Sequence, residues 1–196
     1  QKIHKNYELI LVDDLSEGSA LNLPRALRKK LIRKRIQDIK KLNTNKLNGI
    51  FHLAAQSSVP LSLANFYRSS TNNIESSLKV FEFSKKFSAP IVYASSSAIY
   101  GNLDKGDDAS TKVDLLSPYA ADKYAMEVYA STANKTYGLS SIGLRFFNVY
   151  GPRQDPSSPY SGVISIFIDL MLKGLAIQIN GGYQTRDFIY VSDVVK

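Results

Sequence analysis

A tyrosine and a lysine, Tyr119 and Lys123, stand four residues apart just after Pro118. Proline suits the first turn of a helix, and residues four apart on a helix share one face. A phenol beside an ammonium has a lowered pKa, because the positive charge favours the phenolate. Three serines, residues 95–97, follow an apolar run at 91–94 that is typical of a buried strand. A hydroxyl at that strand end can complete a proton relay, so the set predicts a base that takes a proton from an alcohol as hydride leaves its carbon.

The tyrosine–lysine spacing alone gives weak support for catalysis. Many helices carry it by chance, with the tyrosine ring packed on the lysine stem at the surface. The spacing gains weight here because it follows the serine-tipped strand and because other motifs stand in a consistent order around it. The five segments are His52-Leu53-Ala54-Ala55-Gln56, Ser95 to Gly101, Tyr119-x-x-x-Lys123, Leu144 to Gly151 and Arg186 to Val191.

Together these segments resemble the extended short-chain dehydrogenase/reductases of the NAD-dependent epimerase/dehydratase family. Within that family they are most similar to the 4-epimerases of UDP-glucose and UDP-N-acetylglucosamine. The resemblance implies an α/β fold built on a doubly wound parallel sheet, with NAD as the cofactor. The alternation of strand and helix signals along the chain argues for the same fold.

The sequence predicts two domains, of which neither is expected to be whole. We expect residues 1–150 to form a Rossmann-like NAD-binding domain, and residues 151–196, which begin in a Pro/Gly-rich segment, to start a smaller substrate domain. In a dinucleotide fold the Gly-rich phosphate loop lies about twenty residues before an acid such as Asp13. Only 12 residues precede Asp13, and none is glycine. The sequence therefore predicts a fold that lacks its first strand, glycine turn and helix.

Asp13 lies in an apolar run, residues 8–15, that is typical of a parallel strand. A carboxylate there can accept hydrogen bonds from both ribose hydroxyls of an adenosine, or it can simply cap a turn. The resemblance implies that Asp38 meets the adenine amino group and that Ile39 packs on the ring; without it, Asp38 would be a surface acid among bases. His52 is interpreted as a packed strand histidine. The full set of implied cofactor-binding residues is Asp13, Asp38, Ile39, Leu53, Ala54, Ala55, Gln56, Asn73, Ser95, Tyr119 and Lys123.

The resemblance also implies the catalytic roles. Tyr119 acts as the base on the sugar C4 hydroxyl, Lys123 holds the nicotinamide ribose, and Ser96 orients the hydroxyl and relays the proton. Hydride passes to tightly held NAD and returns to the opposite face of the sugar, so the net redox change is nil. No metal site is expected. The implied substrate-binding residues are Ser96, Ser97, Asn148 and Arg186, whose guanidinium suits a diphosphate but can equally pair with its neighbour Asp187.

Two other functions stay open. Sugar-nucleotide 4,6-dehydratases carry an Asp-Glu pair just after the catalytic strand hydroxyl, whereas this chain has Ser97 and Ala98, so dehydration is disfavoured. The stretch from Gln154 to Val163 also resembles that of the UDP-hexose 4-epimerases. A dehydratase or net oxidoreductase of the same family remains the second enzyme hypothesis. The third is an inactive fragment that at most binds a nucleotide, which the lack of a glycine loop supports.

The composition excludes several classes of protein. The chain has 196 residues, of which 44% are hydrophobic, enough for one sizeable core. It has no cysteine, hence no disulfide framework or thiolate metal site, and no apolar run of transmembrane length. The net charge of +8 is concentrated in residues 25–41, where no aromatic residue is available to stack on bases. We interpret this stretch as a solvated helix face, and expect a cytoplasmic protein that binds neither nucleic acid nor membranes.

Several elements are expected around the motifs. A long helix over 65–87 should turn Ile74, Leu78, Phe81 and Phe83 inward, and residues 141–147 should form a buried strand. Helices are expected at 21–31 and 163–172, a short strand at 176–179, and a helix capped by Asp193. The family suggests a homodimer formed through the helices at 65–87 and 119–137, whose aromatic residues can pack across a pair.

Overall fold

The computed structural model of the chain describes all residues except 1–6, 105, 108, 110 and 159–160. The predicted contribution of Pro159 and Tyr160 to the stretch 154–163 therefore lies outside the described residues. The strands are β1 (Leu11–Val12), β2 (Leu31–Ile32), β3 (Ile50–His52), β4 (Ile91–Ser96), β5 (Ser141–Phe146), β6 (Asn148–Tyr150) and β7 (Phe188–Tyr190). The α-helices are α1 (Arg25–Arg28), α2 (Val59–Ala64), α3 (Phe66–Phe87), α4 (Pro118–Tyr137), α5 (Val163–Leu172) and α6 (Val191–Val194), with 3₁₀ turns η1 (Ala20–Asn22), η2 (Ile36–Asp38) and η3 (Ser97–Tyr100).

Every strand pair that forms is parallel, which confirms the predicted α/β class. The strands make three groups: β1 with β2, β6 with β7, and a three-stranded sheet in the order β3-β4-β5. Parallel neighbours need a crossover, usually a helix. Here α2 and α3 lead from β3 to β4, and α4 leads from β4 to β5. The carboxyl ends of β3, β4 and β5 therefore meet at one edge, where ligands bind in such sheets.

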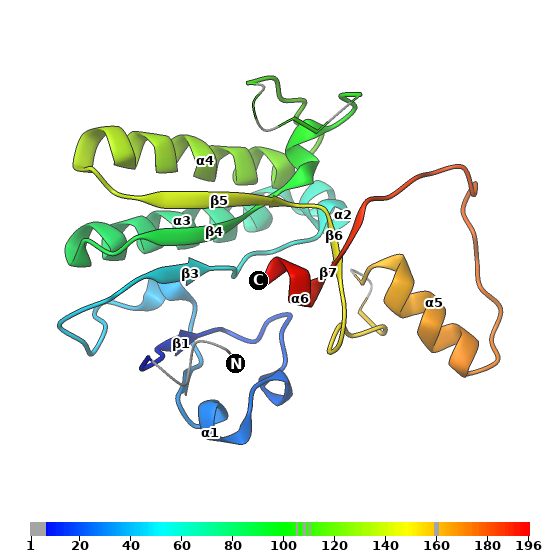
Figure 1. Ribbon diagram of the computed structural model, residues 1–196, viewed down its shortest axis with the longest axis horizontal. Coiled ribbons are helices and arrows are strands. Elements are labelled where there is room, and N and C mark those ends of the chain that lie inside the picture. Colours follow the sequence, from blue (N-terminus) through cyan, green and yellow to red (C-terminus); the bar gives the residue numbers. More distant parts are fainter. Residues whose placement is uncertain (1–6, 105, 108, 110, 159–160) are drawn as a thin grey trace.

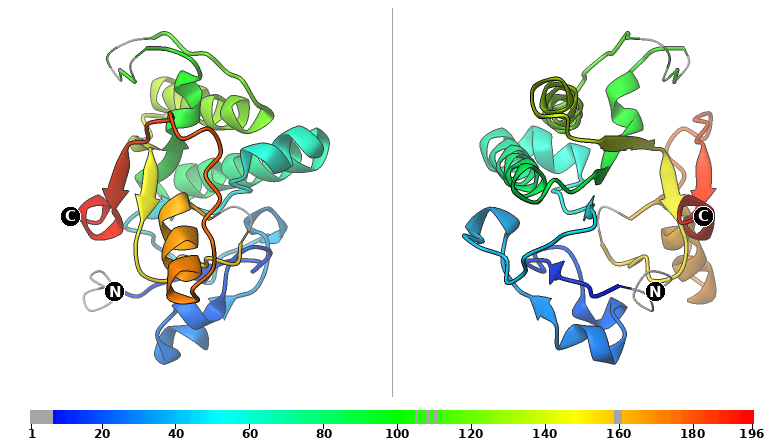
Figure 2. Two further views of the ribbon diagram at one scale, coloured as in Figure 1. Left: turned by 90° about the vertical axis from the view of Figure 1, so that its right-hand side faces the viewer. Right: turned by 60° about the vertical axis from the view of Figure 1, so that its left-hand side comes forward.

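Helices α3 and α4 lie side by side against one face of the three-stranded sheet (Figures 1 and 2). The core between them is small and mixed, and consists of Val80, Ile91, Tyr93, Met126 and Ala130. A second cluster of Ile39, Leu42 and Phe83 packs the segment after η2 against the end of α3. These two clusters fix α4, which carries the tyrosine and the lysine, against the strand that ends in the serines.

The ends of α4 are set by local chemistry, as the sequence predicts. The Ser117 hydroxyl accepts a hydrogen bond from the Ala120 amide at 3.1 Å, and Pro118 occupies the first turn. Gly138 ends the helix in the left-handed conformation, with φ of 66°, which glycine adopts without a Cβ penalty. Tyr119 and Lys123 are thus held in the first and second turns of a helix with a fixed start.

The inward face of α3 differs from the expectation. Phe83 is buried as predicted and Ile74 and Phe81 are half-buried, but Leu78 is 39% exposed. Its place in the contact with α4 is taken by serines, because short side chains let two helices approach closely. Ser76 and Ser77 are buried, and both hydroxyls donate to the Asn73 carbonyl. The polar groups are therefore satisfied within the helix.

The opposite face of the three-stranded sheet is open. Phe51 of β3 is 60% exposed, and Ile142 and Leu144 of β5 are 61% and 36% exposed. The prediction of a buried strand at 141–147 is therefore wrong for one of its faces. The face toward α4 is the covered one, and there Arg145 of β5 binds Glu127 of that helix.

The first forty residues form shorter elements than expected. The strand predicted at 8–15 has ladder pairing only at Leu11–Val12, and the helix predicted at 21–31 is reduced to the single turn Arg25–Arg28. Pro24 sets the start of that turn, and the like charges that follow do not support its continuation. The Arg28 side chain instead donates to the carbonyls of Leu21 and Leu23.

Two expectations near the end of the chain fail, and one is confirmed. Helix α5 matches the prediction at 163–172. Residues 176–179 form no strand; the pairing partner of β6 is β7 instead. Asp193 lies inside α6 and pairs with Lys196 at 2.8 Å, so Tyr190 rather than Asp193 precedes the helix. Within the described part of the chain, no helix combines the length and the apolar character needed to cross a membrane.

Candidate active site

The three residues predicted to catalyse lie together at the carboxyl end of β4. Ser96, Tyr119 and Lys123 are all buried. The Ser96 hydroxyl lies close enough to the Tyr119 phenol to act on its pKa, and the Ser96 oxygen accepts from the Ala98 amide at 3.1 Å. The Lys123 ammonium lies 5.7 Å from the centre of the Tyr119 ring. The fold thus brings a phenol, a hydroxyl and an ammonium into one dry cluster, as proton transfer from an alcohol requires.

The pKa of Tyr119 runs opposite to the expectation from spacing. Burial raises the pKa of the phenol, and the hydrogen bond from Ser96 opposes that rise. Lys123 does not lower it, because its ammonium donates instead to the Ala94 carbonyl, at 2.7 Å. Burial also lowers the pKa of Lys123 to about 8, with the Asp122 charge acting in the other direction. The predicted lowering of the phenol pKa is therefore wrong for this arrangement: desolvation raises the Tyr119 pKa and outweighs the opposing effect of Ser96.

Lys123 retains hydrogen-bonding capacity that a bound molecule can use. A lysine ammonium carries three N–H donors, and among the described residues Ala94 O is its one hydrogen-bond acceptor. The side chain is only 6% exposed, so water cannot freely satisfy the other two donors. A diol such as the ribose of a nicotinamide nucleotide fits this requirement.

The other predicted cofactor residues follow the strand ends. Asp13 comes directly after β1, and its Oδ1 accepts from the Leu15 amide at 2.7 Å. Leu53 and Ala54 after β3 are exposed and Ala55 is half-buried, so small side chains line an accessible edge. These residues fit the ribose and diphosphate ends of a dinucleotide. A glycine-rich phosphate turn is not among the described residues.

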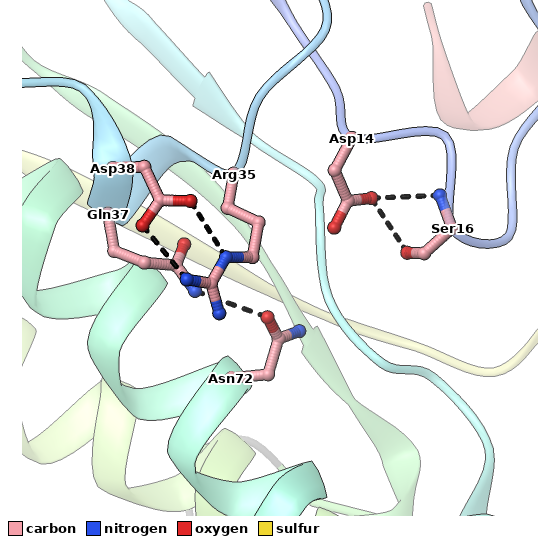
Figure 3. A network of polar contacts seen from close by, with 6 residues as sticks. All are labelled: Asp14, Ser16, Arg35, Gln37, Asp38 and Asn72. Atoms are coloured by element: carbon pink, nitrogen blue, oxygen red, sulfur yellow. Dashed lines mark hydrogen bonds and ion pairs between the residues drawn. The ribbon is translucent and has the colours of Figure 1, made fainter.

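The neighbouring residues Asp38 and Ile39 make different contacts. Asp38 makes a two-pronged ion pair with Arg35, at 2.8 and 2.9 Å (Figure 3). The Arg35 hydrogen bond lowers the pKa of the Asp38 carboxyl. Ile39 is buried in the cluster with Phe83. Next to them Gln37 donates to Asn72 of α3 at 3.2 Å, which ties the η2 turn to the helix (Figure 3).

Gln56 and Asn73 are buried and bonded to each other. The Asn73 side-chain oxygen accepts from the Gln56 amide at 2.8 Å, and its nitrogen donates to the Gln56 carbonyl at 3.1 Å. The Gln56 side chain is itself held by Ser58 and Ser69. Both predicted cofactor residues thus act on the loop after β3, and neither amide side chain is free.

A second polar cluster, centred on Glu127, was not predicted. Ser95 donates to the Glu127 carboxylate at 2.5 Å, and Arg145 of β5 binds both its oxygens, at 2.9 and 2.7 Å. Arg145 also stacks on the Tyr100 ring, with 4.9 Å to its centre. The Ser95 hydroxyl, predicted to meet the cofactor, therefore points to α4. The signal in the sequence was the position of Glu127, four residues after Lys123 and on the same helix face.

The predicted substrate residues beyond Ser96 are spread along the edge. Ser97 is half-buried in η3, directly after Ser96. Asn148 and Arg186 are exposed, and both contact carbonyl oxygens of the segment before β7: Asn148 bonds Asp187, and Arg186 bonds Thr185. A hollow of about 610 Å³ lies beside this region, lined by Tyr100, Glu127, Arg145, Phe146 and Ile189 among others, and Tyr119 is not in its wall.

The sequence matches the NAD dependent epimerase/dehydratase family over residues 2–196. A relative from Methanocaldococcus jannaschii, described as a putative UDP-glucose 4-epimerase, is 39% identical over 99% of this chain and 65% of its own length. The chain thus spans about two thirds of that relative.

Solved structures agree in fold. A UDP-N-acetylglucosamine 4-epimerase from Methanobrevibacter ruminantium, in complex with UDP-N-acetylmuramic acid, is 41% identical with a TM-score of 0.87, over 93% of this chain and 61% of that one. A UDP-glucose 4-epimerase from Thermus thermophilus, in complex with NAD, is 32% identical with a TM-score of 0.83, over 97% of this chain and 65% of that one.

Proposed function

The chain belongs to the NAD dependent epimerase/dehydratase family, and we propose that its activity is the 4-epimerisation of a UDP-hexose with NAD. The observation that carries the proposal is the cluster of Ser96, Tyr119 and Lys123 at the carboxyl end of β4. Relatives and solved structures described as UDP-sugar 4-epimerases support the reaction and the substrate class.

The chain's own residues supply the acid–base part of the reaction. Tyr119 takes the proton of the sugar C4 hydroxyl and later returns it, while Ser96, which lies beside the phenol, orients the same hydroxyl. Lys123 offers its two remaining N–H donors to a ribose, and its charge favours the phenolate once the ammonium turns toward the phenol. NAD, when bound, supplies a nicotinamide ring that accepts and returns hydride.

Dehydration is the second candidate, since the family includes dehydratases. That reaction needs an acid to expel a hydroxyl from the sugar. The two positions after Ser96 are Ser97 and Ala98, and neither can ionise as a carboxylic acid. Glu127, a carboxylate that reaches this strand, is bound by Ser95 and Arg145. Epimerisation is therefore the better fit.

The proposal extends to a homodimer in the cytoplasm. Helices α3 and α4 lie side by side, and their outward faces expose Tyr67, Val128 and Tyr129 by 83%, 49% and 42%. Exposed aromatic and aliphatic side chains on a helix pair suit contact with a second copy. We keep the cytoplasmic location predicted from the sequence as part of this proposal.

The test uses a chain extended to the length of its relatives, incubated with UDP-galactose and no added NADH. Formation of UDP-glucose is the expected result, and UDP-N-acetylgalactosamine and UDP-galacturonate tested in parallel identify the preferred sugar. A dehydrated keto-deoxy product would replace the proposal by the dehydratase. Binding of NAD without conversion of any UDP-sugar would leave only a nucleotide-binding role.

A further inference from the structure

Asp122 is a buried carboxylate that the proposed reaction does not use. It lies in α4 between Tyr119 and Lys123, and is only 6% exposed. A buried acid is costly unless it is paired or hydrogen-bonded, and burial raises the pKa of this carboxyl. The contacts of Asp122, one residue before the buried lysine, must therefore offset the cost of burying its carboxylate.

The first contact of Asp122 is with Asn73 of α3. The Asn73 side-chain nitrogen donates to Asp122 Oδ2 at 3.1 Å and to the Gln56 carbonyl at 3.1 Å. Its oxygen accepts from the Gln56 amide at 2.8 Å. A side-chain amide has two N–H donors and one oxygen, so this arrangement uses all of them. Asp122 thus fixes the orientation in which Asn73 holds both backbone groups of Gln56.

This contact joins three parts of the site. Gln56 belongs to the loop after β3, which carries the small residues predicted to lie along the cofactor. Asn73 belongs to α3, and Asp122 belongs to the helix that carries Tyr119 and Lys123. Asp122 is therefore one of the contacts that hold the loop relative to the catalytic helix, beside the hydrogen bond from the Tyr119 amide to the Ser62 hydroxyl of α2.

Asp122 is also the sequence neighbour of Lys123, and each of the two residues is only 6% exposed. In this buried setting the negative charge of Asp122 favours the protonated form of the Lys123 ammonium, against the effect of burial on the lysine pKa. The other titratable groups that face Lys123 are Tyr119 on the same helix and His52 of β3, and burial keeps His52 neutral by lowering its pKa to about 4. Glu127 is neutralised by Arg145, and α3 presents the neutral Asn73 and Ser77 there.

We propose that Asp122 is a positioning residue, which anchors Asn73 against the Gln56 backbone and serves as the counter-charge of the Lys123 ammonium. The functional part of this inference rests on the proposed NAD-dependent reaction. Two substitutions separate its halves. Asp122→Asn removes the charge but keeps an oxygen that can accept from Asn73, whereas Asp122→Ala removes both.

The anchoring half has a readout that needs no cofactor. In Asp122→Ala, Asn73 loses its outer acceptor, and hydrogen exchange of the Gln56 amide should become about tenfold faster, the size of one net hydrogen bond. In Asp122→Asn the rate should stay within about threefold of the unaltered protein. Glu75→Gln, which removes one exposed carboxylate from α3, is the matched control and should leave the exchange rate unchanged.

The charge half is read from NAD affinity against pH in the extended chain. Lys123 holds a ribose best as the ammonium, so affinity should fall as pH rises through about 8. In Asp122→Asn the proton is less stabilised, and the fall should move to lower pH by about one unit. In Asp122→Ala the same shift should accompany about tenfold weaker binding at pH 7.

Two outcomes would overturn the inference: an unshifted fall in affinity in Asp122→Asn, or unchanged exchange of the Gln56 amide in Asp122→Ala. If the alanine variant does not fold, the pH shift in the asparagine variant decides alone. Failure of the unaltered protein to convert any UDP-sugar, with the exchange and NAD results as expected, would instead overturn only the proposed epimerase activity.

Discussion

Among single residues, Tyr119 is the one whose replacement we expect to lower turnover most. Its phenol is buried beside Ser96 and has a raised pKa, because burial disfavours the phenolate. Tyr119→Phe keeps the ring and removes only the hydroxyl, so the proton of the sugar C4 hydroxyl has no acceptor. We expect turnover in the extended chain to fall by about 10²–10⁴-fold, the usual worth of general acid–base catalysis, with NAD affinity unchanged by calorimetry. Near-normal epimerisation by this variant would contradict the assignment of the base.

His52 makes stability depend on pH. The ring is 7% exposed, and its Nε2 shares a hydrogen bond of 3.1 Å with the Ser77 hydroxyl. Burial lowers the pKa of His52 from 6.5 to about 4. Between these values the unfolded chain binds a proton that the folded chain does not, so stability falls as the pH falls from 6.5 to 4.

The cost of this titration is about 3 kcal/mol of unfolding free energy across the window. Urea unfolding at pH 7 and at pH 4 gives the loss of unfolding free energy for each protein. In His52→Gln, whose side chain at position 52 cannot titrate, this loss should be smaller than in the unaltered chain by about 3 kcal/mol. Parallel losses in the two proteins would show that carboxylates alone cause the acid sensitivity.

The proximity of the proposed catalytic residues could be predicted from the sequence, whereas the contacts that support them could not. Tyr119 and Lys123 share a helix with a readable start at Ser117 and Pro118, so spacing alone placed them on one face. Asp122 contacts Asn73, 49 residues earlier in the chain, and Glu127 contacts Arg145, 18 residues later. Such pairs depend on how α3, α4 and β5 pack, which periodicity does not encode. The predicted lowering of the Tyr119 pKa was wrong for the same reason, because the burial of the phenol depends on the whole fold.

At the scale of elements, β5 fits closely against β4 through a glycine. Gly143 pairs with Tyr93, and a Cβ at Gly143 would lie 2.6 Å from Tyr93 Cε2. Tyr93 is only 5% exposed and cannot move aside easily. Gly143→Ala should therefore destabilise the fold by about 1–3 kcal/mol, as overpacking does, measured as a lower urea midpoint.

Gly49→Ala is the control for this substitution. Its Cβ would meet its nearest atom, Pro90 O, at 3.6 Å, an ordinary contact. A change of similar size in both variants would mean that glycine flexibility, and not the contact with Tyr93, sets the effect.

The outward faces of α3 and α4 predict self-association. Val128→Glu places a charge on the exposed apolar face of α4, and should convert a dimer of the extended chain into monomers in sedimentation equilibrium, with helix content unchanged by circular dichroism. Tyr183, 95% exposed and outside these helices, supplies the control Tyr183→Glu, which should leave the dimer intact. A monomeric unaltered protein would contradict the dimer proposal directly.

Helices and strands were predicted with unequal success, for physical reasons. Helices α3 and α4 are long, and α4 has a capping serine at its start and a glycine at its end, so their signals are strong. Residues 21–31 combine Pro24 with a run of like charges, and only one turn forms. Residues 176–179 alternate like a strand but find no neighbour to pair with, because strand formation depends on a partner elsewhere in the chain.

At the scale of the whole molecule, the parallel strands do not form one continuous sheet. The pair β1-β2 and the sheet β3-β4-β5 share no hydrogen-bonded strand pair. They are joined by side chains instead: Val12 and Ile50 both pack against the cluster of Ile39, Leu42 and Phe83. Unpaired strand edges beside exposed Phe51, Ile142 and Leu144 are a known liability for aggregation. The described residues thus present an incomplete dinucleotide-binding sheet.

This arrangement limits what residues 1–196 can bind alone. In the site that we propose, Asp13 is the acceptor for one ribose and Lys123 supplies donors for the other. A dinucleotide diphosphate is normally held by backbone N–H groups at a helix N-terminus behind a glycine turn. The described residues do not include that turn, and the chain covers 61–65% of the relatives compared above. The two ribose contacts would have to hold the ligand without the group between them.

We therefore expect residues 1–196 to bind NAD at least about tenfold more weakly than a chain extended at both ends to the length of those relatives, by titration calorimetry. The shorter chain should also bind a fluorescent apolar dye at its open sheet face and show no epimerase activity. Equal NAD affinity in the two chains would mean that Lys123, Asp13 and the loop held by Asn73 form a sufficient site without a glycine turn.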